Sequence, residues 1–240
     1  MGKLIAIMQP TYLPWLGYFD LLDHVEAFVL LDNVQFEKQS WQQRNRIRTS
    51  KGLEWLSVPV LHSGLFGQLI CDSRITNSHF VTKHLKAIGI NYGRTPFFSE
   101  FFPDFARCLT EAASNGSLAK LNFAMICWVA QKLGITTPIY VSSQLDCNGT
   151  RSSLIISICR SLSANEYLSP IGSTDYLKED RSQFERAELR VWIHEYEHPV
   201  YKQCYSPFMP YACAMDLLFN EGPCALEIIR SGRRDSLALP

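Results

Sequence analysis

Residues 9–18, Gln-Pro-Thr-Tyr-Leu-Pro-Trp-Leu-Gly-Tyr, bring aromatic rings, prolines and a glycine together in one short segment. The segment joins a predicted strand to a predicted helix, and open α/β sheets bind ligands at such loops, outside the carboxyl ends of the strands. The helix N-terminus favours an anion, and Gly17 permits close approach of a backbone or a ligand. Tyr12 and Trp15 are placed either to stack on a sugar or base or to form an aromatic plug over the sheet. The sequence leaves both interpretations open.

Asp32 ends the second predicted strand and lies beside this loop if the two strands are neighbours. A carboxylate there can accept hydrogen bonds from ligand hydroxyls, hold an amine, or cap the following turn. We predict that Asp32 acts as a proton acceptor, with Tyr12 and His198 as further catalytic candidates.

Residues 38–51 carry five basic side chains and no acidic one, with a tryptophan among several amides. Arginine binds phosphate in a bidentate manner, and the indole of Trp41 offers a stacking face. Because the chain has 23 basic and 23 acidic residues in all, one patch of this size fits a diphosphate better than a long nucleic acid. We therefore predict a phosphate site and no nucleic-acid partner, with a solvated loop as the alternative.

Residues 194–198, His-Glu-Tyr-Glu-His, match the HExxH zinc pattern, which needs a helix so that both histidines share one face. The preceding Leu-Arg-Val-Trp-Ile is typical of a strand, and Pro199 prevents a helical continuation. In a strand, His194 and His198 would lie about 13 Å apart, too far to share one zinc ion. We predict no metal site, while a histidine at a strand end can still act as an acid or base. No GxGxxG or GxxxxGK[ST] motif occurs, so no cofactor is predicted.

Alternating apolar strands and amphipathic helices predict a single α/β domain over residues 1–240, with a mostly parallel sheet flanked by helices. The N-terminal β-α-β unit should have parallel strands and a right-handed crossover. Residues 34–52 are predicted as a polar loop and residues 231–240 as a flexible tail. The predicted strands are 4–8, 27–31, 55–60, 137–141, 166–169 and 189–196. The predicted helices are 14–25, 80–88, 100–113, 118–133, 151–162 and 214–230, the last broken at Gly222-Pro223.

The composition, with 47% hydrophobic and 19% charged residues, is that of a globular protein and excludes a disordered one. Eight cysteines occur without a CxxC pair, which favours free thiols in a reducing compartment. The apolar runs are too short to span a bilayer, and the N-terminus lacks a complete signal peptide. We expect a cytoplasmic protein that is not inserted in a membrane.

Several motifs together resemble the WbqC-like family of bacterial proteins. They are IAIMQPTYLPWLGYFDLL, FVLLDNVQF, QSWQQRNRI followed by WLSVPV, YLSPIGSTDYL, and VYKQCYSPFMPYACAMDLLFNEG. The resemblance covers nearly the whole chain and implies a role in the biosynthesis of O-antigen or other surface glycans. The substrate-binding residues predicted from these motifs are Gln9, Trp15, Gly17, Gln35, Lys38, Trp41, Arg44, Asn45, Arg46, Tyr176, Tyr201 and Gln203. Where members of the family commonly carry a serine before the late Asp-Leu-Leu, this chain has Ala-Cys-Ala-Met before Asp216.

The resemblance implies a transferase that moves an acyl or aminoacyl group, such as glycyl, to the amine of a nucleotide-linked sugar. Its partners would then be the nucleotide-linked sugar and an activated acyl donor, and an oligomer is possible. The N-terminal β-α-β unit also resembles nucleotidylyltransferases of the HUP or Rossmann-like type. Residues 15–18, Trp-Leu-Gly-Tyr, stand where those enzymes carry HxGH, but they have neither histidine. The alternative is therefore a non-catalytic module that binds a nucleotide or a glycan.

Overall fold

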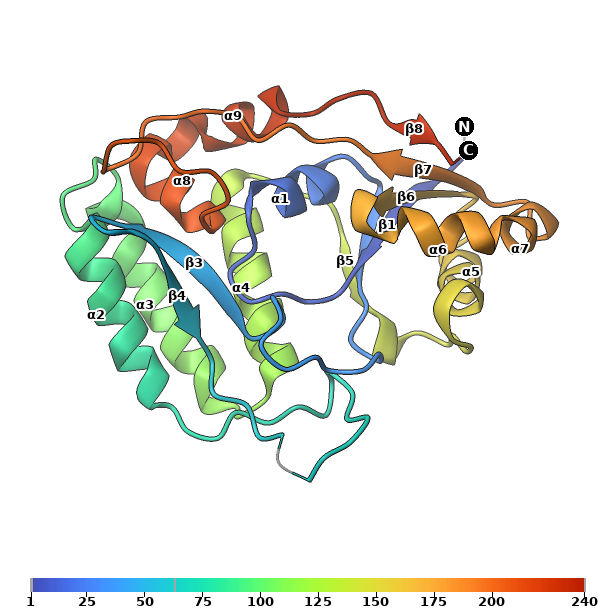
Figure 1. Ribbon diagram of the computed structural model, residues 1–240, viewed down its shortest axis with the longest axis horizontal. Coiled ribbons are helices and arrows are strands. Elements are labelled where there is room, and N and C mark those ends of the chain that lie inside the picture. The colour runs from blue at the N-terminus through green and yellow to red at the C-terminus, as the bar shows by residue number, and fades with distance from the viewer. Residues whose placement is uncertain (1, 63, 240) are drawn as a thin grey trace.

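A computed structural model describes residues 2–62 and 64–239, and within them the chain builds a six-stranded sheet flanked by helices (Figure 1). The strands lie in the order β5-β2-β1-β6-β7-β8, the first five parallel and β8 antiparallel to β7. This confirms the predicted α/β class with a mostly parallel sheet. The strands are β1 (Leu4–Met8), β2 (Ala27–Leu30), β5 (Ile139–Val141), β6 (Glu166–Pro170), β7 (Arg190–His194) and β8 (Leu237–Ala238).

The β1-α1-β2 unit forms as its sequence predicts, with α1 at Leu16–Asp23. β1 and β2 are parallel, and Ile5 lies opposite Ala27. From β1 the sheet continues to β2 and β5 on one side and to β6 and β7 on the other. The chain thus reverses its direction of growth across the sheet between β1 and β6, and ligands of such sheets bind at that point, at the carboxyl ends of the strands.

The two faces of the sheet bury different helices because successive strand side chains point to opposite sides. Ala6 and Phe28 face the larger core, while Ile5 and Ile7 face the smaller one. The larger core contains α1, α2 (His79–Tyr92), α3 (Phe98–Ser114), α4 (Leu118–Leu133), α8 (Ala214–Glu221) and α9 (Ala225–Ser231). The smaller core contains α5 (Arg151–Ser161), α6 (Thr174–Glu179) and α7 (Arg181–Arg186).

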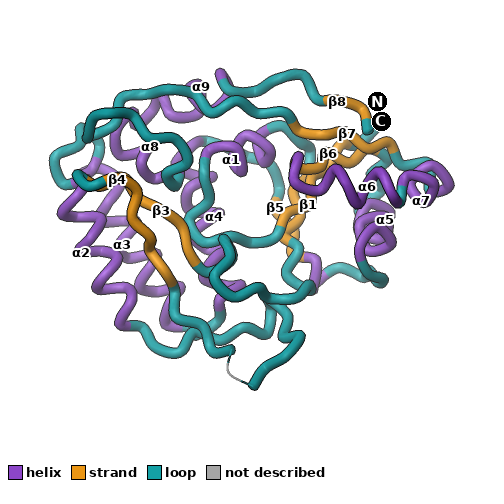
Figure 2. Tube along the Cα trace, in the orientation of Figure 1, coloured by secondary structure: helices purple, strands orange, loops and turns teal. Residues whose placement is uncertain are grey.

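A hairpin of β3 (Arg44–Thr49) and β4 (Gly52–Ser57) forms a separate two-stranded antiparallel sheet (Figure 2). The prediction of a polar loop over residues 34–52 is therefore wrong, and the strand predicted at 55–60 begins and ends earlier. Asn45 and Ile47 are buried and alternate with arginines along β3. This alternation of buried and less buried residues has the period of a strand. Only one residue on the buried side is strongly apolar, however, so a search for alternating apolar residues does not detect the strand.

Further differences concern the C-terminal half. The sequence analysis did not predict α6 and α7, which are only six residues long each. The predicted tail instead supplies β8, which pairs with β7, so it is part of the fold up to residue 239. The predicted break at Gly222-Pro223 is confirmed by the short 3₁₀ turn Gly222–Cys224 between α8 and α9. Residues 1 and 240 of the predicted domain and tail lie outside the described residues.

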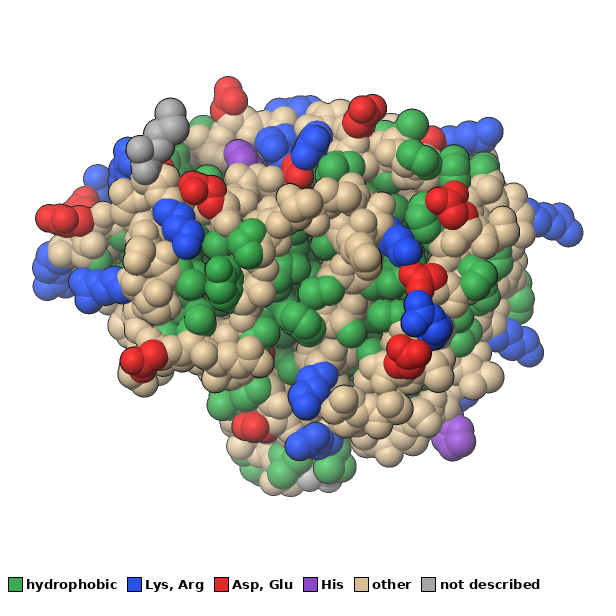
Figure 3. All heavy atoms as spheres, turned by 180° about the vertical axis from the view of Figure 1, so that it is seen from behind, with side chains coloured by type: hydrophobic (Ala, Val, Ile, Leu, Met, Phe, Trp, Pro, Cys, Tyr) green, Lys and Arg blue, Asp and Glu red, His purple; other side chains and the backbone are tan. Residues whose placement is uncertain are grey.

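The side of the molecule opposite to Figure 1 shows apolar side chains gathered across its middle (Figure 3). Within residues 2–62 and 64–239, no helix combines the length and the apolar character that a membrane span requires.

Candidate functional site

The loop after β1 is fixed at the carboxyl edge of the sheet by one buried amide. Asn122 of α4 is fully buried and donates from Nδ2 to the carbonyl oxygens of Pro10 (3.0 Å) and Gln42 (2.8 Å). The Gln42 side chain in turn donates to Oε1 of Gln9 at 2.8 Å. The backbone N–H of Tyr12 donates to the carbonyl oxygen of Trp41 at 3.0 Å. Residues 9–13 and 41–43 therefore form one rigid partition, with a separate hollow on each side.

The first hollow, the aromatic hollow, has a volume of about 240 Å³. It is lined by Met8, Thr11, Trp15, Tyr18, Trp41, Asn45, Arg46 and Tyr211. Four of the predicted substrate-binding residues thus meet here, although they come from the loop after β1, the segment before β3 and β3 itself: Trp15, Trp41, Asn45 and Arg46.

The indole of Trp15, in the lining of the aromatic hollow, is held by contacts with other aromatic rings. Its ring packs at centroid distances of 5.5 Å from Tyr211 and 5.6 Å from Tyr196. A Cβ atom on Gly17 would lie 2.4 Å from the Trp15 ring. Gly17 therefore leaves room for the indole of Trp15, and the predicted close approach of a ligand at this residue is replaced by an intramolecular contact.

β3 presents Arg44 and Arg46 on one side, backed by two tryptophans; we call these four residues the arginine face. The Arg44 guanidinium lies 4.3 Å from the centroid of the Trp55 ring. The Arg46 guanidinium lies 5.3 Å from the Trp41 ring and 5.5 Å from the Trp55 ring. Neither arginine pairs with a carboxylate within the described residues, and the Nε atom of each is buried without a hydrogen-bond partner. The arginine face is thus a concentrated positive charge, and none of the residues that the structure describes supplies its counter-ion.

Arg48, the next residue on this side of β3, has a different environment. It is 2% exposed and donates from Nη2 to the carbonyl oxygen of Pro207 at 2.8 Å, and from Nη1 to that of Thr49. Arg48 therefore anchors the segment 203–211 rather than facing the solvent.

The second hollow, the Asp32 cavity, lies on the other side of the partition and has a volume of about 420 Å³. Asp32 is 4% exposed and follows β2, as predicted. Its Oδ1 accepts hydrogen bonds from Ser142 Oγ (3.1 Å) and the Ser143 N–H (2.9 Å), and its Oδ2 accepts one from Ser143 Oγ (2.8 Å). Asp32 thus joins the carboxyl ends of β2 and β5. The structure does not bring Asp32 into one hollow with Asn45, since Asp32 lines this cavity and Asn45 lines the aromatic hollow.

Tyr12, predicted to be catalytic, is fully buried and lines neither hollow. Its hydroxyl lies 2.9 Å from Nδ1 of His84 on α2. Burial raises the pKa of Tyr12 well above its usual range and lowers the pKa of His84 to about 4, so both groups are neutral near pH 7. The buried Tyr12 side chain fixes the loop after β1 from inside. Of the two interpretations that the sequence left open for Tyr12, this corresponds to an aromatic plug over the sheet.

His198 is also engaged on both ring nitrogens. Nδ1 lies 2.8 Å from the carbonyl oxygen of Pro199, and Nε2 accepts the Tyr211 N–H at 3.1 Å. This pattern requires a neutral ring that carries its proton on Nδ1. Burial also lowers the pKa of His198, and its ring stacks on Trp15 at 6.1 Å. The ring therefore has no free lone pair for a proton and instead supports the wall of the aromatic hollow.

Tyr201 and Gln203 converge on a carboxylate that the sequence analysis left without a role. The hydroxyl of Tyr201 donates to Asp216 Oδ2 at 2.6 Å, and Gln203 Nε2 donates to the same oxygen at 2.9 Å. Asp216 is fully buried in the first turn of α8, and burial raises its pKa although these hydrogen bonds oppose the shift. The only sequence signal was an acid within the apolar run Ala-Met-Asp-Leu-Leu-Phe. This network fixes the segment 195–213, which delivers Tyr211 and His198 to the aromatic hollow.

The remaining predicted residues lie elsewhere. Tyr176 is on α6, over the smaller core, with the Arg151 guanidinium 5.9 Å from its ring. Gln35 and Lys38 are exposed in the segment between β2 and β3. None of these three lines the aromatic hollow or the Asp32 cavity.

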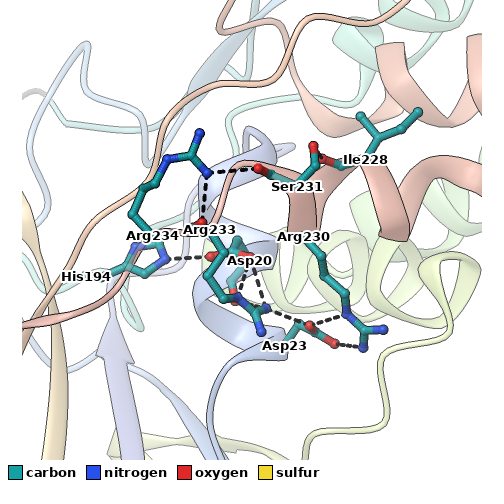
Figure 4. Close-up of polar contacts among 8 residues, drawn as sticks. All are labelled: Asp20, Asp23, His194, Ile228, Arg230, Ser231, Arg233 and Arg234. Carbon is teal, nitrogen blue, oxygen red and sulfur yellow. Dashed lines mark hydrogen bonds and ion pairs between the residues drawn. The ribbon is translucent and has the colours of Figure 1, made fainter.

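The histidines of the HExxH pattern do not approach a common point. His194 ends β7, and its Nε2 lies 2.7 Å from Asp20 Oδ2, whereas the ring of His198 stacks on Trp15 from behind the lining of the aromatic hollow. The side chains of Asp20, His24 and His194 do come within 4.8 Å of one another in metal-ligand fashion. Arg233 Nε donates to Asp20 Oδ1 at 2.9 Å, however, so a guanidinium already provides the positive charge there (Figure 4). A metal cation beside it would meet direct repulsion.

The model of the WbqC-like protein family matches residues 9–228 of the chain. The chain belongs to the WbqC-like protein family. An uncharacterized protein of Mycobacterium tuberculosis, Rv1507c, is 33% identical to it over 233 residues, which are 97% of this chain and the full length of that protein. No solved structure matches at a significant level. The family match includes the loop after β1, the arginine face and the segment that carries Tyr211.

Proposed function

We propose that this WbqC-like protein is a transferase of surface-glycan biosynthesis that binds a nucleotide-linked amino sugar. In this proposal it moves an acyl or aminoacyl group, such as glycyl, from an activated donor to the amine of that sugar. The observation that carries the proposal is the arginine face, with Arg44 and Arg46 lacking carboxylate partners beside the aromatic hollow.

Phosphate is the ligand group that best fits the arginine face. Partly buried guanidiniums without a counter-ion are unfavourable, and a bound anion removes that cost. Arginine binds the oxygens of a phosphate through two parallel N–H donors, and the rings of Trp41 and Trp55 orient the guanidiniums without neutralising them. A diphosphate offers a separate group to each of Arg44 and Arg46.

The aromatic hollow suits a single ring. Its volume of about 240 Å³ is below the ~300–1,000 Å³ of pockets that enclose whole drug-sized ligands. Trp15, Trp41 and Tyr211 offer apolar faces, while Thr11 supplies a hydroxyl beside them. A sugar ring presents just such apolar faces and hydroxyl edges, so we place the sugar in the hollow and its diphosphate at the arginine face.

Acyl transfer needs no additional cofactor in this arrangement. The sugar nitrogen attacks the acyl carbonyl carbon, an N–C bond forms, the bond to the donor's leaving group breaks, and the nitrogen releases one proton. Trp41 and Tyr211 are about half exposed at the rim, so the proton can pass to solvent. Holding the amine and the acyl carbon in alignment is then the main contribution of the protein.

A non-catalytic module that binds a nucleotide or a glycan is the second candidate. It is favoured by one specific observation, since among the described residues that line the aromatic hollow none is a carboxylate or a histidine. Measured turnover separates the two candidates, because both predict binding.

The test combines binding and turnover for purified protein with a panel of UDP-, GDP-, CDP- and dTDP-linked amino sugars. We expect at least one to bind, and Arg46→Ala to weaken it about tenfold or more, since a hydrogen bond to a charged group is worth about 1.5–3 kcal/mol. Arg181→Ala, which removes an exposed arginine of α7 that lines neither hollow, is the matched control. Mass spectrometry of the sugar after incubation with activated acyl donors reports the transfer. Absence of binding across the panel, or unchanged affinity in Arg46→Ala, would overturn the proposal.

A further inference from the structure

The Asp32 cavity is a second hollow at the carboxyl edge, and the proposed function gives it no role so far. Its volume of about 420 Å³ is within the range of pockets that hold small ligands. Apolar side chains from β2, β5 and α4 form its walls, and polar groups stand at one end. The lining residues used below are Leu30, Asp32, Phe123, Ile139, Ser143 and Lys120.

The Asp32 carboxylate is held in a fixed orientation at this polar end. Three donors from Ser142 and Ser143 occupy part of its acceptor capacity, two of them on Oδ1 and one on Oδ2. A carboxylate accepts about four hydrogen bonds, so Oδ2 keeps one further position. A carboxylate fixed in this way can accept a hydrogen bond from a neutral ligand hydroxyl without changing its own orientation.

The position of Asp32 in the topology points to a ribose hydroxyl. In sheets with this β-α-β arrangement, an acidic residue about 20 residues after the first turn, at the end of the second strand, accepts a hydrogen bond from a ribose hydroxyl. Asp32 directly follows β2 in the same arrangement. The apolar slot beside it, between Leu30, Ile139 and Phe123, has the character that a nucleobase requires.

One cationic side chain at the cavity is available to a phosphate group of the ligand. Lys120, in the first turn of α4, lines the cavity and pairs with no carboxylate in the part of the chain that the structure describes. Pro10 lines this cavity while its neighbour Thr11 lines the aromatic hollow. The two spaces are therefore lined by neighbouring residues of the chain, and a ligand that binds in both has to pass over these two residues at the surface of the partition.

We infer that the Asp32 cavity binds the ribonucleoside half of the nucleotide-linked sugar, with a ribose hydroxyl on Asp32 and the base in the apolar slot. The inference rests on the proposed function and deepens it, because the diphosphate then runs past Pro10 and Thr11 to the arginine face. It assigns Asp32 to binding of the substrate, in place of the proton acceptor that the sequence suggested.

The test uses isothermal titration with UDP, ADP, GDP and CDP, each beside its 2′,3′-dideoxy counterpart, and with pyrophosphate. For the nucleotide that binds best, we expect the dideoxy form to bind about tenfold more weakly, or weaker still, to the wild-type protein, since the one hydrogen bond that a ribose hydroxyl can donate to the free position on Asp32 Oδ2 is lost. Asp32→Ala should remove this difference, and Asp32→Asn should reduce it. Equal affinities of the two forms for the wild type, or a difference that persists in Asp32→Ala, would overturn the inference.

A second pair of variants tests the cavity without altering Asp32. Ala119→Trp places an indole in the lining of the cavity and should abolish nucleotide binding while pyrophosphate binding is retained. Gln131→Trp, on an exposed position of the same helix, is the control and should change neither. Nucleotide binding that survives in Ala119→Trp would contradict the inference.

Binding of pyrophosphate distinguishes a failure of this inference from a failure of the proposed function. If it binds through Arg46, but no nucleotide binds more tightly than it does, the nucleoside site is wrong and the phosphate site stands. If pyrophosphate and nucleotides all fail to bind, the proposed function and the inference are both wrong.

Discussion

β3 and residues 230–234, which we call the C-terminal segment, are both rich in arginine, but the surroundings of these arginines differ. Arg230 donates from Nε and Nη2 to the two carboxylate oxygens of Asp23, at 2.8 and 2.7 Å. Arg233 bridges Asp20 and Asp23 at 2.9 and 2.7 Å (Figure 4). Arg44 and Arg46, in contrast, contact tryptophan rings and no carboxylate within the described part of the chain.

This difference shows that the group contacting an arginine indicates whether the arginine stabilises the fold or binds a ligand. The charge alone does not, because it is the same in both regions. In the C-terminal segment the guanidiniums of Arg230 and Arg233 are neutralised by buried carboxylates of α1, so these pairs fasten the segment to the first helix. In the arginine face the guanidiniums are oriented by aromatic rings and remain available to an anion. The first cluster should therefore determine stability, and the second should determine ligand affinity.

Asp20→Ala should have the largest effect on stability. Asp20 is fully buried and accepts hydrogen bonds from Arg233 and His194, so its removal leaves a partly buried guanidinium without its partner. We expect a loss of about 3–5 kcal/mol in the free energy of unfolding, measured by urea denaturation. Ligand affinity of the protein that remains folded should be unchanged. Unaltered stability, or a selective loss of affinity, would break the comparison between the two clusters.

Acid should weaken the paired cluster through Asp23. Burial raises the pKa of Asp23, but the hydrogen bonds from Arg230 and Arg233 outweigh it, and the pKa lies below its usual value. A carboxyl with a lowered pKa contributes stability that is present above about pH 4 and is lost as the pH falls through the lowered value. We expect the free energy of unfolding to decline below about pH 4, and to decline less steeply in Asp23→Asn.

His84 should also lower the free energy of unfolding in acid, but in a higher pH range than Asp23. Its pKa of about 4 in the folded protein means that the unfolded chain binds the proton first as the pH falls from about 6.5 to 4. This earlier loss of stability should persist in Asp23→Asn and become smaller in His84→Gln, while His24 and His198, whose pKa values are also lowered by burial, maintain the rest of it. If Asp23→Asn instead removes the loss above pH 4, the assignment of the two groups is wrong.

Arg234→Ala should have the smallest effect. Arg234 pairs with Glu197 at 2.6 Å, but the two side chains are 49% and 73% exposed. Exposed pairs contribute about 0–1 kcal/mol because water screens them. We expect a change of less than about 1 kcal/mol in unfolding and none in ligand affinity, which sharpens the comparison by showing that pairing stabilises only when it is buried.

Much of the fold could be predicted from the sequence because its signals are local. The apolar run of β1 and the spacing of Leu16, Phe19 and Leu22 specify strand and helix without knowledge of the rest of the chain. β3 could not be predicted in this way, since its buried side includes Asn45, whose Nδ2 donates to the Leu13 carbonyl oxygen at 2.7 Å. That hydrogen bond makes a polar residue compatible with burial, and it exists only after the loop has folded against the strand.

The sequence by itself determined the β1-α1-β2 unit, the carboxylate at the end of β2 and the charge of residues 38–51. Only the tertiary structure decided that Tyr12 is buried, that Asp32 and Asn45 face different hollows, and that Arg46 lacks the kind of partner that Arg233 has. The physical reason is that helix and strand formation depend on side chains a few residues apart. Burial and charge pairing depend on which distant residues meet, as when the Asp20 carboxylate of α1 meets Arg233 at the other end of the chain.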